Sequence, residues 1–171
     1  MLVVAFAGAA GLFTGHRVVA ADAAFDCQVA YKQLKGLAGE WEGSVMKSDG
    51  PATKVTYRVT ANGHTLVETL FPGSNHEMIS MYHLDQGRLV LTHYCAMGNQ
   101  PRMALDPAKS SAKELIFDFT GGGNLDASRD PHVHSGRIRF PEADRLEAEW
   151  YVFSEGKLAG TNSFFLKRSR P

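Results

Sequence analysis

The feature of this sequence that most constrains its fold is a series of short segments in which apolar and polar residues alternate. Ten such segments follow the first 39 residues, at 40–47, 53–60, 64–71, 77–84, 88–96, 102–105, 114–120, 133–140, 145–153 and 158–168. Alternation with a period of two is typical of β-strands that bury one face. Because no helical pattern separates these segments, they favour an antiparallel meander over a βαβ fold, and closure into a barrel removes its two exposed edges.

Turn residues lie between most of the segments. Asn62-Gly63 predicts a two-residue type I′ hairpin, since both residues accept a positive φ. Asp85-Gln86-Gly87, 142–144 and 155–156 predict three further tight reversals. Two connections are longer, at 96–101 and at 120–131, and the second begins near Gly121-Gly122-Gly123. We expect these two to be open loops, which carry function more often than tight turns do.

One helical pattern precedes the strands. Cys27, Tyr31 and Leu34 recur at spacings of three and four, Asp26 is suited to cap the helix, and Gly36 is suited to end it. The fold class predicted is therefore mainly β: a single antiparallel up-and-down β-barrel of about ten strands, preceded by a short N-terminal helix.

The first residues have the pattern of an export signal. Residues 2–13 are almost wholly apolar, and small residues at 18–20 and 21–23 suit cleavage after Ala20 or Ala23. We therefore expect residues 1–23 to be a signal peptide, residues 24–171 to be the barrel domain, and the protein to be periplasmic or secreted. That compartment permits a disulfide between Cys27 and Cys95, although a free buried thiol explains each cysteine equally well.

The charge of the chain argues against two classes of partner. The 171 residues include 18 acidic and 18 basic residues, without a basic stripe. Nucleic acids are therefore excluded as expected partners. The apolar run at 2–13 is too short to span a bilayer, so we expect no membrane insertion.

A motif at the start of the first strand carries a resemblance. The run Gly39-Glu40-Trp41-Glu42-Gly43 directly follows the predicted helix and resembles the G-x-W signature of the lipocalin and wider calycin superfamily. The resemblance implies a barrel whose closed end is plugged by Trp41. It also implies a basic residue from the last strand that packs across this tryptophan, either Arg168 or Lys167.

Longer stretches resemble a group of uncharacterised bacterial lipocalin-like proteins, a likeness that implies the fold but no known activity. They are residues 66–73, 76–78, 82–84, 91–95 and 99–103. A more distant likeness is to nitrobindin-like haem barrels, which also begin with a G-x-W-type strand. Those barrels ligate haem through a histidine on a late strand, whereas residues 158–168 contain none.

A barrel of this size holds about one small ligand, in a mostly apolar interior. A two-residue loop after Asp85 would pair Ser80 with His93 and Met78 with Cys95, and would put His93 and Cys95 on one face. Glu68 shares a face with Leu66 and Leu70, which is unusual for a solvated carboxylate. We predict the following ligand-binding residues, with the last two at the rim: Glu68, Met78, Tyr82, His93, Cys95, Asn99 and Arg102.

The leading hypothesis is an exported barrel that binds a small, mostly apolar molecule without catalysis. One alternative is a haem or metal site at His93 or at the His132/His134 pair, which lacks a third ligand at a fixed spacing. Another is a cavity enzyme with Glu68 or His93 as acid or base. The sequence contains no G-x-S-x-G, Walker-type or H-E-x-x-H motif. A barrel filled by its own side chains, with an interaction role, is the remaining alternative.

Overall fold

Ten strands form where the alternating segments were expected. The computed structural model describes residues 24–169, in which one helix and one 3-10 turn accompany the strands. The elements are α1 (Cys27–Lys35), β1 (Gly39–Val45), β2 (Ala52–Thr60), η1 (Ala61–Gly63), β3 (Thr65–Leu70), β4 (Met78–Asp85), β5 (Arg88–Tyr94), β6 (Gln100–Leu105), β7 (Glu114–Gly123), β8 (His132–Glu142), β9 (Arg145–Ser154) and β10 (Lys157–Arg168).

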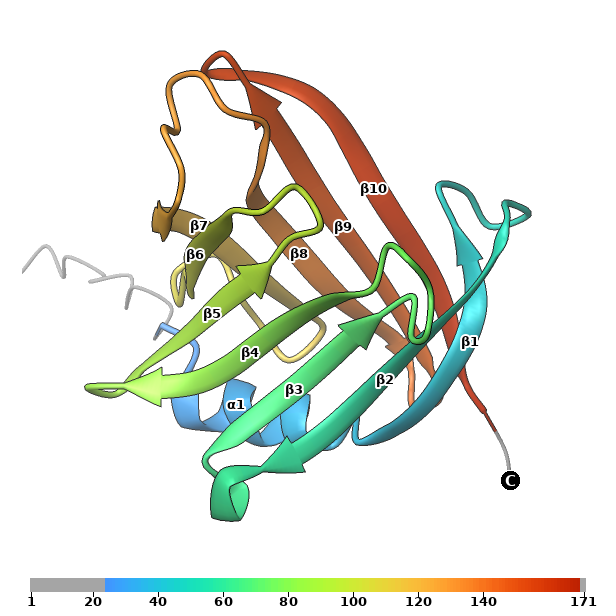
Figure 1. Ribbon diagram of the computed structural model, residues 1–171. Helices are drawn as coiled ribbons and strands as arrows, with labels where there is room; N and C mark the ends of the chain where they lie inside the picture. The colour runs from blue at the N-terminus through green and yellow to red at the C-terminus, as the bar shows by residue number, and fades with distance from the viewer. Residues whose placement is uncertain (1–23, 170–171) are drawn as a thin grey trace, which may run out of the picture.

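The strands form a closed up-and-down barrel, which confirms the predicted fold class (Figure 1). Each strand pairs antiparallel with the next along the chain, and β1 pairs with β10 to close the circle. Closure gives each of the ten strands a partner on both sides, although β7 and β8 pair only between residues 114–117 and 136–139. The inward side chains form one continuous apolar core that includes Leu66, Leu91, Phe117 and Leu146.

Helix α1 lies across one end of the barrel (Figure 1). Asp26 caps it as predicted, because one carboxylate oxygen accepts hydrogen bonds from the backbone N–H groups of Gln28 and Val29, at 2.7 and 3.0 Å. Its buried face consists of Ala30, Tyr31 and Leu34, and the helix contacts β2, β4 and β5. The opposite end carries the β1–β2, β3–β4, β5–β6, β7–β8 and β9–β10 loops, because consecutive strands run in opposite directions.

The closed end is completed by Trp41 and Arg168, in the arrangement that the lipocalin resemblance implied. Trp41 is buried, and the Arg168 guanidinium lies 4.5 Å from the centre of its ring. The same guanidinium donates hydrogen bonds of 2.9 Å to the carbonyls of Ala38 and Gly36. The last strand is thereby joined to the junction between α1 and β1.

The tight reversals agree with the sequence except at one hairpin. Asp85 pairs with Arg88 around Gln86-Gly87, and both loop residues have positive φ, as a type I′ turn requires. The Asn62-Gly63 prediction is wrong: Thr60 pairs with Thr65, which leaves a four-residue connection that contains η1. Ala61 also adopts a positive φ, of 49°, so the reversal begins one residue earlier than the Asn-Gly signal indicates.

The two expected open loops are shorter than predicted. Gly121, Gly122 and Gly123 extend β7 and pair with Arg102, Pro101 and Gln100 of β6. Glycine is rare inside strands, but a Cβ on Gly122 would meet the Leu125 side chain and the backbone of Gln100, so this close approach requires the missing side chain. The open connections are therefore 95–99 and 124–131.

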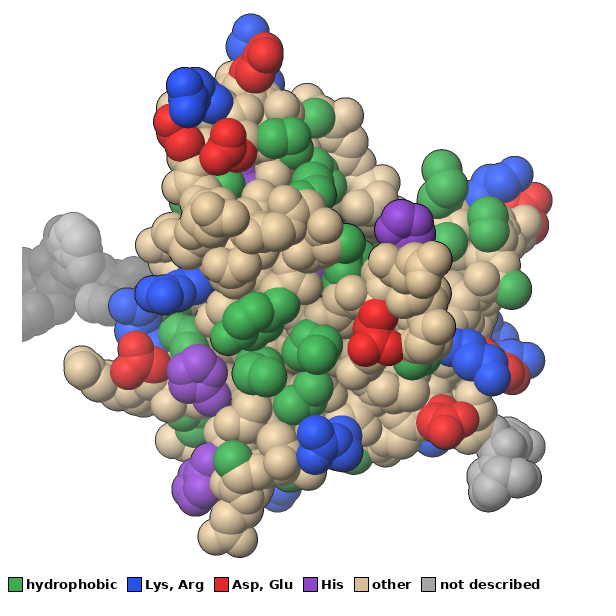
Figure 2. Space-filling model, viewed as in Figure 1, with side chains coloured by type: hydrophobic (Ala, Val, Ile, Leu, Met, Phe, Trp, Pro, Cys, Tyr) green, Lys and Arg blue, Asp and Glu red, His purple; other side chains and the backbone are tan. Residues whose placement is uncertain are grey.

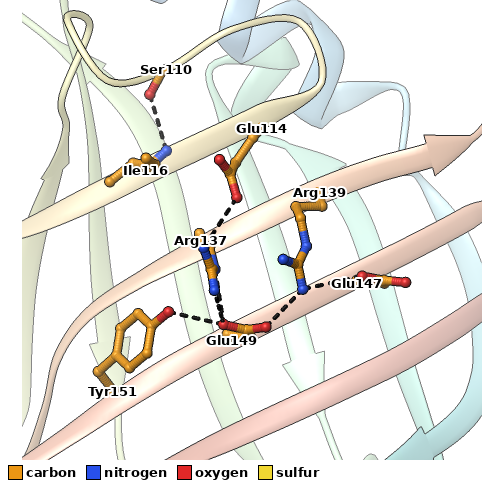
Figure 3. Close-up of polar contacts among 8 residues, drawn as sticks. All are labelled: Ser110, Glu114, Ile116, Arg137, Arg139, Glu147, Glu149 and Tyr151. Atoms are coloured by element: carbon orange, nitrogen blue, oxygen red, sulfur yellow. Dashed lines mark hydrogen bonds and ion pairs between the residues drawn. The ribbon is translucent and has the colours of Figure 1, made fainter. Parts of the chain in front are cut away.

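Charged side chains cross-link the outer face of β7, β8 and β9 (Figure 3). Glu149 accepts hydrogen bonds from Arg137, Arg139 and Tyr151, and Arg137 also lies 3.6 Å from Glu114. This network lies opposite the inward-facing Ile138 and Ala148 and fits a structural role. Acidic and basic side chains also lie close together over the face shown in Figure 2, in agreement with a net charge of zero.

The predicted signal peptide lies outside the described residues. Within residues 24–169, no helix is long and apolar enough to cross a membrane. Cys27, at the start of α1, and Cys95, beyond β5 at the opposite end, are both free thiols.

Candidate functional site

A cavity of about 220 Å³ lies inside the barrel. Its walls are mostly apolar and come from nearly all parts of the chain, from Val45 on β1 to Phe164 on β10. Phe71, just beyond β3, also lines it and packs on Phe164 at a ring distance of 5.7 Å. Phe71 has a φ of 53°, a left-handed conformation that is uncommon for a bulky residue and is more frequent at functional sites than elsewhere.

His93 is the most informative polar residue of this wall. It is 5% exposed, and its Nδ1 lies 3.0 Å from the Ser80 hydroxyl. The other ring nitrogen, Nε2, is buried without a hydrogen-bond partner among the described residues. Burial lowers the pKa of His93 to about 4, so the ring is neutral near pH 7. A buried polar atom without a partner is costly, and its presence at a cavity wall suggests a binding function.

Glu68 and Ser80 continue the polar chain behind His93. The three residues are cross-strand neighbours on β3, β4 and β5. Glu68 accepts hydrogen bonds from the hydroxyls of Tyr57 and Tyr82, at 2.7 and 2.9 Å. Burial raises the pKa of the Glu68 carboxyl, while hydrogen bonds from Tyr57, Tyr82 and Ser80 act in the opposite direction.

The hydrogen bond at Nδ1 leaves Nε2 as the ring atom that is open to a ligand. The Ser80 hydroxyl lies 3.0 Å from His93 Nδ1, and which of the two atoms donates depends on the tautomer of the ring. In the tautomer that is protonated at Nδ1, the Nε2 atom carries a lone pair, which can accept a hydrogen bond or bind a metal ion.

The structure separates the predicted ligand-binding residues into three groups. Met78, His93 and Cys95 line the cavity together, and the Ser80–His93 pairing agrees with the predicted register. Glu68 and Tyr82 are buried beneath it and contact each other instead of the open space.

The two predicted rim residues lie elsewhere. Asn99 is buried and donates a 2.8 Å hydrogen bond to the Pro131 carbonyl, which ties the two open loops together. Arg102 is exposed and borders an outer groove with His83 and Asp85, because its position on β6 points away from the interior.

Several wall residues were not predicted from the sequence. Trp150, Val152 and Asn162 come from β9 and β10, and Val133 comes from β8. Trp150 matters most, because its indole N–H is buried and finds no acceptor within the described part of the chain. For Val133, Trp150 and Val152, an apolar position on a late strand is the signal that could have found them, but only the closed barrel brings these strands opposite β4 and β5.

The His132/His134 pair forms an aromatic cluster with Phe119 and Phe153. The Nδ1 of His132 is 2.8 Å from the Asp130 carbonyl, and its Nε2 is 3.0 Å from Nδ1 of His134. His134 stacks on Phe119 and Phe153 at ring distances of 4.7 and 4.1 Å. Three of the four imidazole nitrogens are thus engaged in hydrogen bonds.

Comparisons with known proteins add no relative. A scan against protein-family models finds no matching family, and a search of curated proteins finds no significant match. The class of protein is therefore defined by architecture: a ten-stranded, up-and-down barrel of the lipocalin-like kind, closed at one end by a helix and a tryptophan. Its particular character lies in the apolar interior cavity, where His93 and Trp150 each present a nitrogen that has no partner within residues 24–169.

Proposed function

We propose that this protein binds a small, mostly apolar molecule inside the barrel and performs no chemistry on it. The observation that carries the proposal is the cavity itself, whose lining is apolar apart from a few polar groups. Ligand sites usually have this composition, with polar groups that fix orientation.

The size of the cavity limits the ligand. An apolar cavity of ~150 Å³ accommodates benzene, whereas drug-sized ligands fill ~300–1,000 Å³. At about 220 Å³, the cavity fits a substituted single ring or a short branched chain. A hydroxyl group on that ligand would donate to His93 Nε2, accept from the Trp150 N–H, or both, and would relieve the cost of these unpaired atoms.

A matched pair of probes tests the binding. Isothermal titration calorimetry with p-cresol and toluene, which differ by one hydroxyl, should show that both bind. We expect p-cresol to bind about three- to tenfold more tightly, the range that one additional neutral hydrogen bond provides. Val152→Phe, which fills the cavity, should weaken both.

His93→Leu tests the polar end of the site. It should remove the preference for p-cresol and keep the binding of toluene, while His83→Leu on the outer groove serves as the matched control. The absence of heat with either probe, or equal binding to the wild type and to Val152→Phe, would refute the proposal.

The same proposal includes export to the periplasm or the medium. The apolar run at 2–13 and the small residues that precede Ala21 and Ala24 support it. Mass spectrometry of the protein recovered from a periplasmic or culture fraction should give a mature N-terminus at Ala21 or Ala24. An intact chain confined to the cytoplasmic fraction would contradict export.

A further inference from the structure

The proposed function does not use the sulfur atoms of the cavity wall. Four sulfur-containing residues, Met78, Cys95, Met97 and Met103, line the same cavity as His93. Methionine often serves as adaptable packing, and a thiol often serves as a small apolar side chain. Their arrangement around an unpaired imidazole nitrogen goes beyond packing.

Two of these sulfur atoms lie at the separation that a single metal ion imposes on its ligands. Cys95 Sγ and Met78 Sδ are 3.9 Å apart. Metal–sulfur bonds are about 2.3 Å long, so two sulfur ligands at a trigonal or tetrahedral angle lie roughly 3.8–4.0 Å from each other. The pair therefore needs little rearrangement to hold one ion.

His93 provides a third donor beside this pair. His93 lies on β5, Cys95 directly follows the end of that strand, and both side chains line the cavity. The Nε2 atom of His93 is buried without a hydrogen-bond partner within residues 24–169.

The atoms behind His93 suit a metal ligand as well. Its Nδ1 is hydrogen-bonded to Ser80, whose cross-strand neighbour on β3 is the buried Glu68. Histidines that bind metals almost always donate their second ring N–H to such an outer partner, which fixes the tautomer and the ring orientation.

The charge of the cavity selects among metal ions. Its lining contains no Lys, Arg, Asp or Glu among the described residues. A monovalent ion bound to one thiolate is neutral as a unit, whereas a divalent ion would leave a net positive charge in an apolar space, which is costly. Thiolate and thioether donors are also soft ligands that favour Cu(I).

We propose that the cavity wall binds one Cu(I) ion through Cys95 Sγ, Met78 Sδ and His93 Nε2. Met97 lies in the half-exposed 95–99 loop at the mouth and is placed to act as an additional thioether ligand or an entry point. Binding releases the Cys95 thiol proton to solvent, and the ion enters and remains as Cu(I), so no electron is transferred.

The donor set of this site differs from one built of carboxylate, imidazole and thiolate ligands alone. Within the described residues, no three His, Cys, Asp or Glu side chains cluster around one point. Here the donor set reaches three only because a thioether contributes to it, and thioethers bind Cu(I) while contributing little to Zn²⁺ sites.

Anaerobic titration of the reduced protein with Cu(I), in competition with a colorimetric Cu(I) chelator, tests the proposal. We expect one ion per chain. Cys95→Ser should weaken binding about 100-fold or more, because a hydroxyl replaces the soft ligand. Met78→Leu and Ser80→Ala should weaken it about 10- to 100-fold, the second through loss of the outer hydrogen bond. X-ray absorption should report two sulfur ligands and one nitrogen ligand.

Matched controls lie elsewhere in the chain. Cys27→Ser removes the thiol on α1, and Met81→Leu removes a thioether on β4 that does not line the cavity; neither should change the affinity. Thermal unfolding of each variant without copper distinguishes a variant that has lost only the copper site from one that no longer folds. Equal affinity in Cys95→Ser and Cys27→Ser, or no stoichiometric binding by the folded wild type, would overturn the proposal.

The two proposals can fail independently. Val152→Phe should block p-cresol without weakening Cu(I), because Val152 lies on β9 and provides no donor. A protein that binds copper but neither aromatic probe would retain the metal site and lose the proposed small-molecule function. Binding of both aromatic probes by a protein that takes up no Cu(I) would be the reverse outcome and would overturn the metal site alone.

Discussion

At the scale of single residues, the interior of this barrel is defined by one polar chain that runs from Glu68 through Ser80 to His93. Each member is at least 95% buried, Ser80 is hydrogen-bonded to His93, and the chain ends at His93 Nε2, which has no partner among the described residues. The energetic cost of that last atom is the physical reason to look for a ligand there.

The lowered pKa of His93 makes folding stability depend on pH. The folded protein holds the imidazole proton more weakly than the unfolded chain, since burial lowers the pKa from 6.5 to about 4. The contribution of His93 to the free energy of unfolding is therefore fully present above pH 6.5. It falls by about 3 kcal/mol as the pH drops toward 4. Urea unfolding with a metal chelator present should show the loss, and His93→Gln should remove it.

The Glu68 carboxyl makes folding stability depend on pH in the opposite direction, so its effect has to be separated from that of His93. Burial raises the pKa of its carboxyl, so its contribution declines as the pH rises above the ordinary value of 4.5. The difference between the wild type and His93→Gln at each pH isolates the histidine. If that difference is the same at pH 7 and pH 4.5, His93 is not buried as a neutral ring.

At the scale of elements, period-two alternation determines most of what could be predicted. It placed Glu68 and His93 inside, because each shares a face with leucines, and the Gln86-Gly87 turn fixed the register that pairs His93 with Ser80. Alternation predicts which face of the sheet a side chain lies on, but not its depth along the barrel axis. The inward orientation predicted for Tyr82 and Glu68 is therefore correct, but both side chains lie below the cavity.

Tertiary contacts account for what the sequence did not reveal. Three consecutive glycines are typical of a loop, but in β7 the absence of side chains lets this segment approach β6 closely. Trp150 joins the site because β9 lies across the barrel from β5, which depends on closure by all ten strands. Arg102 faces outward, in a segment too short for alternation to establish its orientation from sequence.

Gly136 provides a test of packing between β8 and β9. A Cβ at this position would collide with the six-membered ring of Trp150, its cross-strand partner, whereas Gly160 on β10 has open space around it and no positive φ. Gly136→Ala should destabilise the protein by about 1–3 kcal/mol, the usual cost of overpacking. It should also shift the Trp150 fluorescence. Gly160→Ala, the matched control, should leave both nearly unchanged; equal effects would show that Trp150 does not pack on Gly136.

At the scale of the whole molecule, the barrel depends on a contact between its two sequence ends. The β1–β10 pairing closes the sheet, and sequence-distant contacts of this kind are slow to form in folding. Arg168 strengthens the closure, since it covers the Trp41 ring and hydrogen-bonds the carbonyls of Ala38 and Gly36.

Arg168 should therefore contribute to stability well beyond an ordinary surface residue. Arg168→Lys keeps the charge but loses the planar fork that reaches both carbonyls, so we expect a loss of about 1–3 kcal/mol in the free energy of unfolding. Because the contact joins α1, β1 and β10, hydrogen exchange should accelerate at both chain ends together. Arg145 is an exposed arginine whose side chain pairs with Glu142 alone among the described residues, so Arg145→Lys should cost less than about 0.5 kcal/mol. If both variants were equally stable, the closed end would be held by strand pairing alone, and Trp41 would need no basic partner.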